Sequence, residues 1–173
     1  MKPTTDHAPG RRISARAAAL ALCLLLAALC GCAARPSTEE IVRFFYSVGD
    51  GWDSVRDSIE KEDSRVVLRT LRYDALGRRE IKRSEKTGEI PEEALKALQE
   101  IVRERGILAW NGFDKEAESL MDGYGFGLEI EYADGTTVSA QGYGVFPEEF
   151  EEANAALSAF LSEWEDALPD TAP

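Results

Sequence analysis

Carboxylates are the side chains of this chain that offer the most chemistry. Four of them follow a Trp-Asn-Gly-Phe cluster at close spacing: Asp114, Glu116, Glu118 and Asp122. Closely spaced carboxylate oxygens are ligands for a hard cation such as Ca²⁺. The segment lacks the Asp-x-Asp-x-Asp-Gly order of an EF-hand loop, which has a glycine at the sixth position. A solvated loop is therefore the favoured interpretation, cation binding is the alternative, and no cofactor is expected.

Paired carboxylates could also hydrolyse a glycosidic bond, one as the acid and the other as the base or nucleophile. The chain holds 32 acidic residues, so some pair will be suitably spaced in any fold, and the sequence nominates none. Other site chemistries lack their residues, because the only histidine and all three cysteines lie within the first 32 residues: His7, Cys23, Cys30 and Cys32. Cysteine nucleophiles, Ser-His-Asp triads and His or thiolate zinc sites are therefore excluded for the remainder.

Glycines recur at two places that could be mistaken for phosphate loops. Gly123, Gly125 and Gly127 alternate with Tyr and Phe, but they lead into a predicted strand, whereas a phosphate-binding loop opens a helix. The segment 142–144 does precede a predicted helix, but glutamates are expected in the first turn of that helix and would repel an anion. Both glycine groups are interpreted as allowing tight turns and close packing under aromatic rings.

Two predicted loops, residues 110–125 and 142–146, flank the second of two predicted hairpins. They should lie near one edge of the sheet, because both connect to that hairpin. An aromatic residue in a loop can stack on a sugar or a peptide, and Trp110, between Gly106 and Gly112, is a better candidate for the surface than Trp164, which lies on a predicted helix face. The candidate ligand-binding residues of these loops are Trp110, Asn111, Phe113, Tyr124 and Tyr143.

The N-terminus has the pattern of an export signal. Four basic residues precede an apolar run over residues 17–29, which ends in Leu29-Cys30-Gly31-Cys32. This ending resembles a bacterial lipobox, which predicts a signal peptide over residues 1–31, lipidation of Cys32 and a polar tether to residue 40. The alternative is an uncleaved membrane anchor over residues 17–34. Either anchor would leave the domain exported and tethered to the outer face of a bacterial cell membrane or outer membrane.

The length and the charge bound the class of the exported part. Removal of residues 1–31 leaves 142 residues, about one domain. It also takes away Asp6 and four basic residues, so the net charge of −12 becomes −15. Such a surface repels phosphate backbones, and nucleic acid is not an expected partner.

The residue pattern predicts an α+β domain over residues 41–167, followed by a flexible tail over residues 168–173. Strands are expected over residues 41–48 and 52–60, with hairpins over 65–86 and 124–142; for 52–60 a helix is the alternative that the apolar spacing also fits. Helices are expected over 91–104 and 147–167, each beginning with Pro-Glu-Glu. The predicted architecture is an antiparallel sheet with both helices packed on one face. The similar helix starts, 56 residues apart, suggest a β-β-α duplication.

A longer pattern joins several short elements between residues 88 and 161. It consists of Trp110-Asn111-Gly112-Phe113, then Asp122-Gly123, Asp134-Gly135, Gly142 and Phe146-Pro147. This pattern resembles that of small bacterial envelope lipoproteins and related exported proteins. The resemblance implies an α+β domain in a surface or periplasmic setting, and it implies no activity.

These observations predict a lipid-anchored domain that binds an envelope protein or glycan and catalyses nothing. The alternatives are a carboxylate-dependent hydrolase acting on envelope glycan and a cation-binding structural protein of the envelope.

Overall fold

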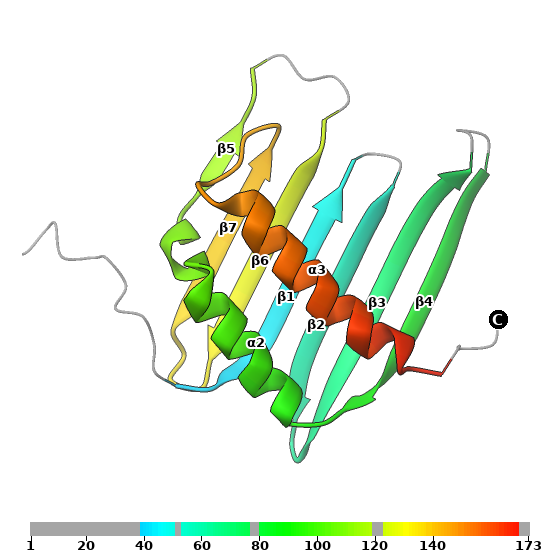
Figure 1. Cartoon of the computed structure of the whole chain (residues 1–173), viewed down its shortest axis with the longest axis vertical. Helices are drawn as coiled ribbons and strands as arrows, with labels where there is room; N and C mark the ends of the chain where they lie inside the picture. The colour runs from blue at the N-terminus through cyan, green and yellow to red at the C-terminus, as the bar shows by residue number, and fades with distance from the viewer. Residues whose placement is uncertain (1–38, 51–52, 77–79, 119–122, 170–173) are drawn as a thin grey trace, which may run out of the picture. The chain divides into compact units, whose positions relative to one another are not determined.

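The computed structural model describes residues 39–50, 53–76, 80–118 and 123–169 (Figure 1). The predicted export segment with Cys32 lies outside the described residues, as do Trp52 and Asp122. Within the described part of the chain, no helix combines the length and the apolar composition needed to cross a bilayer.

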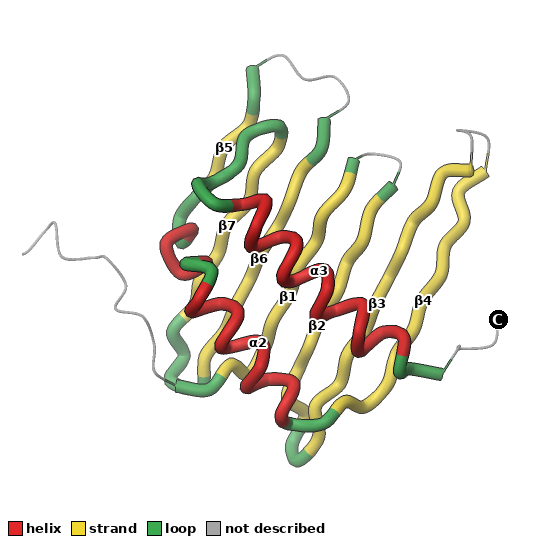
Figure 2. The backbone as a smooth tube through the Cα atoms, viewed as in Figure 1, coloured by secondary structure: helices red, strands yellow, loops and turns green. Residues whose placement is uncertain are grey.

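Seven strands in the described residues form one sheet, in the order β4-β3-β2-β1-β6-β7-β5. Their bounds are β1 Ile41–Gly49, β2 Ser54–Glu62, β3 Arg65–Leu76, β4 Glu80–Ile90, β5 Asp114–Glu116, β6 Gly125–Tyr132 and β7 Thr137–Tyr143. Neighbouring strands are antiparallel, except that β5 runs parallel to β7. The hairpin of β6 and β7 lies between β1 and the short edge strand β5 (Figure 2).

The helices cover one face of this sheet, which confirms the predicted α+β class (Figure 1). They are α2 Glu93–Glu104, the 3₁₀ helix η1 Ile107–Trp110 and α3 Phe150–Asp166. The two hairpin-helix units are β3-β4-α2 and β6-β7-α3, and their common origin stays a prediction.

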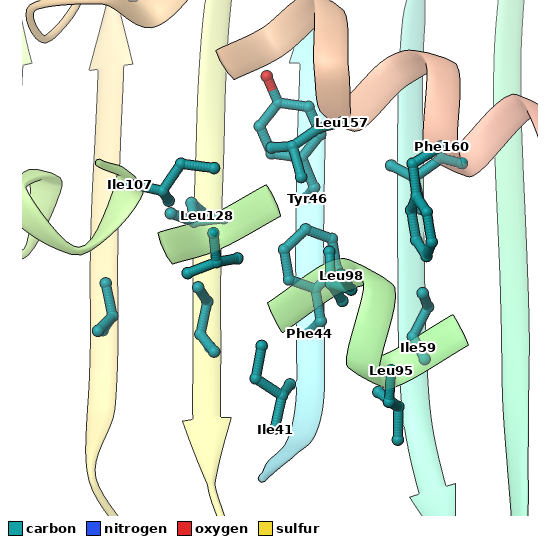
Figure 3. Packing of buried hydrophobic residues seen from close by; sticks show 14 of the residues in the cluster. Ile41, Phe44, Tyr46, Ile59, Leu95, Leu98, Ile107, Leu128, Leu157 and Phe160 are labelled. Carbon is teal, nitrogen blue, oxygen red and sulfur yellow. The ribbon is translucent and has the colours of Figure 1, made fainter. Parts of the chain in front are cut away.

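Buried and exposed side chains alternate along the strands, which explains why the helices cover only one face of the sheet. Phe44 and Tyr46 of β1 point to the helices, and their register partners on β6, Ile130 and Leu128, share that face. The apolar stripe of α2 packs on them, with Leu95 and Leu98 fully buried. Figure 3 shows this core, in which the Tyr46 hydroxyl points toward α3.

Polar side chains line the opposite face, where arginines bridge the strands. Arg43 of β1 lies 3.3 Å from both Glu60 of β2 and Glu131 of β6. Arg69 of β3 reaches Glu60 at 2.9 Å and Glu62 at 2.5 Å. These side chains are at least partly exposed, so this face is a solvated surface of the sheet. Exposed ion pairs of this kind contribute little stability each.

The predicted start of the last helix is wrong. This helix begins at Phe150, three residues later than predicted, because Glu149 adopts a left-handed conformation with φ of 60°. At the two ends of the described domain, the Glu40 carboxylate accepts a 2.9 Å hydrogen bond from Lys61 of β2, and Leu168 is 7 % exposed with its amide donating to the carbonyl of Glu165.

Candidate functional site

Trp110 is a core residue, and the prediction that it lies at the surface is wrong. Its side chain is 3 % exposed. The ring centroid lies 5.7 Å from that of Phe126 and 5.6 Å from that of Phe150, so it joins β6 to α3. The turn of η1, which follows Gly106 at a φ of 65°, directs the indole inward. Trp110 therefore cannot stack on an external ligand.

Asn111 and Phe113 have structural contacts that hold the loop after η1 to the sheet. The Asn111 side-chain oxygen accepts a 3.1 Å hydrogen bond from the Ser139 amide of β7. The Phe113 ring packs on Phe126, with centroids 6.1 Å apart, and Lys115 lies over its ring at 5.1 Å. The residues that follow Phe113 form the strand β5, whereas a loop was predicted there.

The two predicted loops meet at one end of the β6-β7 hairpin, as expected. The Gly144 amide donates to the carbonyl of Tyr124 at 2.9 Å, and the Gly123 amide donates to the Tyr143 hydroxyl at 2.7 Å. The Ala117 amide reaches the carbonyl of Tyr143 at 2.9 Å. Tyr143 therefore ties three segments together, whereas the ring of Tyr124 is left to face outward.

Tyr124 borders a hollow of about 530 Å³ next to the start of α3. We call it the Tyr124 groove, and its lining residues are Tyr124, Phe146, Pro147, Glu149, Phe150, Glu151, Glu152 and Asn154. Among the described residues, Tyr124 is the only exposed large hydrophobic side chain, at 44 %. Its ring centroid lies 5.9 Å from that of Phe146, which in turn lies 4.6 Å from that of Phe150. The apolar wall of the groove is therefore continuous with the core.

Hydrogen bonds to Asn154 support the floor of the groove. The Tyr46 hydroxyl donates to the side-chain oxygen of Asn154 at 2.7 Å, and the Ser158 hydroxyl reaches the same oxygen at 3.3 Å. Burial raises the pKa of Tyr124, and a hydrogen bond with Asn154 acts in the opposite direction. Burial also raises the pKa of Tyr46, so this hydroxyl stays protonated and can serve as the donor. Asn154 is therefore held in place from below.

The glycines near this site shape the backbone, in agreement with their predicted role. A Cβ added at Gly142 would lie 2.2 Å from the carbonyl oxygen of Val145 and 2.7 Å from the Phe126 ring. A Cβ at Gly127 would lie 2.9 Å from the Ser47 hydroxyl. Gly125 and Gly127 both lie in β6, away from any helix start, so they form no phosphate loop.

A second hollow, of about 670 Å³, lies on the face of the sheet opposite to the helices. We call it the sheet trough, and one row across its strands is Arg56, Ser47, Gly127, Gln141 and Asp114. Small residues form the middle of this row and make the hollow. Its polar ends are engaged within the protein, because Gln141 donates to Asp114 at 2.9 Å and Arg56 lies 5.7 Å from the Tyr73 ring centroid.

The acidic residues considered for a cation lie mainly on β5. Asp114 and Glu116 pair with Gln141 and Tyr143 of β7, which places them at the edge of the sheet. Glu118 follows the strand, and Asp122 lies outside the described residues. In the described ranges, no three His, Cys, Asp or Glu side chains gather as a metal site would require.

A carboxyl that the sequence did not single out as a functional residue lies beneath α3. Asp57 is 2 % exposed and Thr70 beside it 1 %. Burial raises the pKa of Asp57 from its ordinary value of 3.8 to about 6, and the Thr70 hydroxyl and the nearby Arg72 partly offset this rise. Arg72 is itself engaged by Glu165 of α3, whose carboxylate accepts hydrogen bonds of 2.9 and 2.7 Å from its Nε.

Sequence reasoning therefore identified Tyr124 and the predicted loop that ends at Phe146, and it missed the groove residues that come from the start of α3. Asn154 was not singled out, because its place depends on where α3 begins. A signal was present in Phe146-Pro147, an aromatic residue fixed by a proline beside an exposed tyrosine.

No protein-family model, curated protein or solved structure matches the chain. The class that the fold and the site define is an α+β domain with one helix-covered face and an aromatic groove at the end of the β6-β7 hairpin.

Proposed function

We propose that this chain is an exported, membrane-anchored binding module of the bacterial cell envelope, which recognises a partner through the Tyr124 groove and catalyses nothing. The anchor follows from the lipobox-like ending at Cys32 and from the resemblance to envelope lipoproteins. The observation that carries the binding role is the exposed ring of Tyr124 beside a hollow of about 530 Å³. Exposed aromatic rings next to a concave apolar wall are typical anchors for a partner.

The groove supports this role better than the sheet trough does. The trough is larger, but its polar residues contact one another, and its floor is made of strand backbone and small side chains. The groove instead presents three aromatic or proline side chains that half face solvent: Tyr124, Phe146 and Pro147. Covering such rings removes apolar surface from water, which is the main source of binding free energy.

Asp57 does not support a hydrolase. A raised carboxyl pKa is a property of a general acid, but a general acid must also reach its substrate. Asp57 is 2 % exposed and faces α3, so no substrate can contact it in this structure. A carboxylate-dependent hydrolase is the competing proposal, and turnover of cell-wall fragments by the purified protein would favour it over the binding module.

Alanine at Tyr124 is expected to abolish partner capture and to lower the free energy of unfolding by only about 1 kcal/mol, because Tyr124 is 44 % exposed and lies at the margin of the core. The measurement is affinity recovery from crosslinked envelopes together with urea denaturation. Tyr73→Ala is the matched control, since it removes the same side chain from β3, remote from the groove. Undiminished capture by the Tyr124 variant would contradict the assignment of the groove.

A further inference from the structure

The rim of the Tyr124 groove carries charge of a single sign. Three of its lining residues are glutamates, Glu149, Glu151 and Glu152, and all three are exposed. No lysine or arginine lines the groove, and α3 contains none along its whole length. None of the three glutamates forms an ion pair with another described residue. The groove therefore presents uncompensated negative charge next to aromatic rings.

Two of these glutamates also stabilise the start of α3. Glu151 and Glu152 lie in the first turn, where a carboxylate is stabilised by the helix dipole. The dipole accounts for their presence on the helix, but it does not account for the apolar hollow that they border. The combination of an aromatic wall and a carboxylate rim is what defines the kind of ligand.

A basic side chain satisfies both parts of this combination. An ammonium or guanidinium group is attracted to the face of an aromatic ring and to a carboxylate, while the methylene stem of the side chain packs on apolar surface. The Tyr124 and Phe146 rings supply the faces and the stem contact, and the glutamates supply the counter-charge.

We infer that the Tyr124 groove receives a lysine or arginine side chain from a partner protein, an inference that rests on the proposed binding function. Charge complementarity favours a protein partner over the lipid surface, because the membrane leaflets of an envelope carry anionic headgroups that the groove would repel. The net charge of −15 calculated for the exported part attracts a basic partner over a longer range.

The test uses the full-length protein in detergent micelles and two probes that differ in the terminal ammonium group. Nα-acetyl-lysine methylamide carries this group, and Nα-acetyl-norleucine methylamide has the same four-carbon stem without it. We expect the lysine probe to shift the backbone amide resonances of Glu151, Glu152 and Asn154, and to bind about fivefold more tightly than the norleucine probe at low salt. Equal binding of the two probes, or shifts confined to other parts of the chain, would overturn the inference.

Neutralising the rim gives a second measurement. The double variant Glu151→Gln, Glu152→Gln should bind the lysine probe about fivefold more weakly. Glu163→Gln is the matched control, because it makes the same change on an exposed position of α3, about 16 Å further along the helix. Unchanged binding by the double variant would also overturn the inference.

Partner capture separates the two proposals. If Tyr124→Ala loses the partner and the double glutamine variant retains it, the groove is the binding site and the basic side chain is the wrong occupant. If Tyr124→Ala retains the partner, the groove assignment itself is wrong. Loss of capture in both variants, with Glu163→Gln unaffected, supports both proposals.

Discussion

Replacing Trp110 with alanine is expected to lower the free energy of unfolding by about 3–5 kcal/mol. The indole is 3 % exposed and contacts Phe126 of β6 and Phe150 of α3. Its removal leaves a cavity at the junction of η1, the sheet and α3. Those elements cannot close the cavity without moving the wall of the Tyr124 groove.

Urea denaturation followed by circular dichroism measures this loss without relying on tryptophan fluorescence. Trp110→Phe keeps an aromatic ring in the cluster and should cost markedly less than alanine. A loss below about 1 kcal/mol for the alanine variant would mean that Trp110 lies at the surface, as the sequence alone suggests.

Replacing Asp57 with asparagine is expected to stabilise the protein by about 3 kcal/mol at pH 7. Burial raises the pKa of Asp57 to about 6 in the folded protein, from 3.8. The folded state therefore holds a proton that the unfolded state releases between about pH 4 and pH 6. Stability from this group is fully present below pH 4 and falls as the pH rises through 6. Asparagine has a similar shape and no ionisation, so it removes that loss.

The groups around Asp57 determine the size of this effect. The Thr70 hydroxyl and Arg72 favour its charged form, while Glu165 of α3 disfavours it. The measurement is the free energy of unfolding at several pH values for wild type, Asp57→Asn and Asp74→Asn, the last being an exposed carboxyl on β3. Parallel pH profiles for wild type and Asp57→Asn would show that Asp57 keeps an ordinary pKa.

Most of the fold could be predicted from local patterns. The alternation of β6 and the Asp134-Gly135 turn, with Gly135 at a φ of 80°, predicted the second hairpin. The amphipathic stripe and the Pro91 start predicted α2. These signals succeed because the hydrogen bonds and the burial that they encode are settled within a few neighbouring residues.

The remaining elements depend on contacts that local patterns do not encode. β5 has the sequence Asp-Lys-Glu, which favours a loop, and it forms a strand because the edge of β7 offers hydrogen-bonding partners. Trp110 is buried because a 3₁₀ turn directs it inward, and a glycine-flanked tryptophan does not reveal that turn. The groove itself requires the later start of α3, which the left-handed Glu149 imposes.

The most direct test of the proposed function is crosslinking in intact envelopes followed by affinity recovery, comparing wild type with Cys32→Ala. Tethering raises the effective concentration of a module near a partner in the same membrane. We expect the wild-type protein to fractionate with membranes and to yield a crosslinked protein partner, and we expect the Cys32→Ala protein to leave the membrane fraction and to yield little. Membrane fractionation that is the same for both forms, with no crosslinked partner from either, would contradict the account of a lipid-anchored binding module.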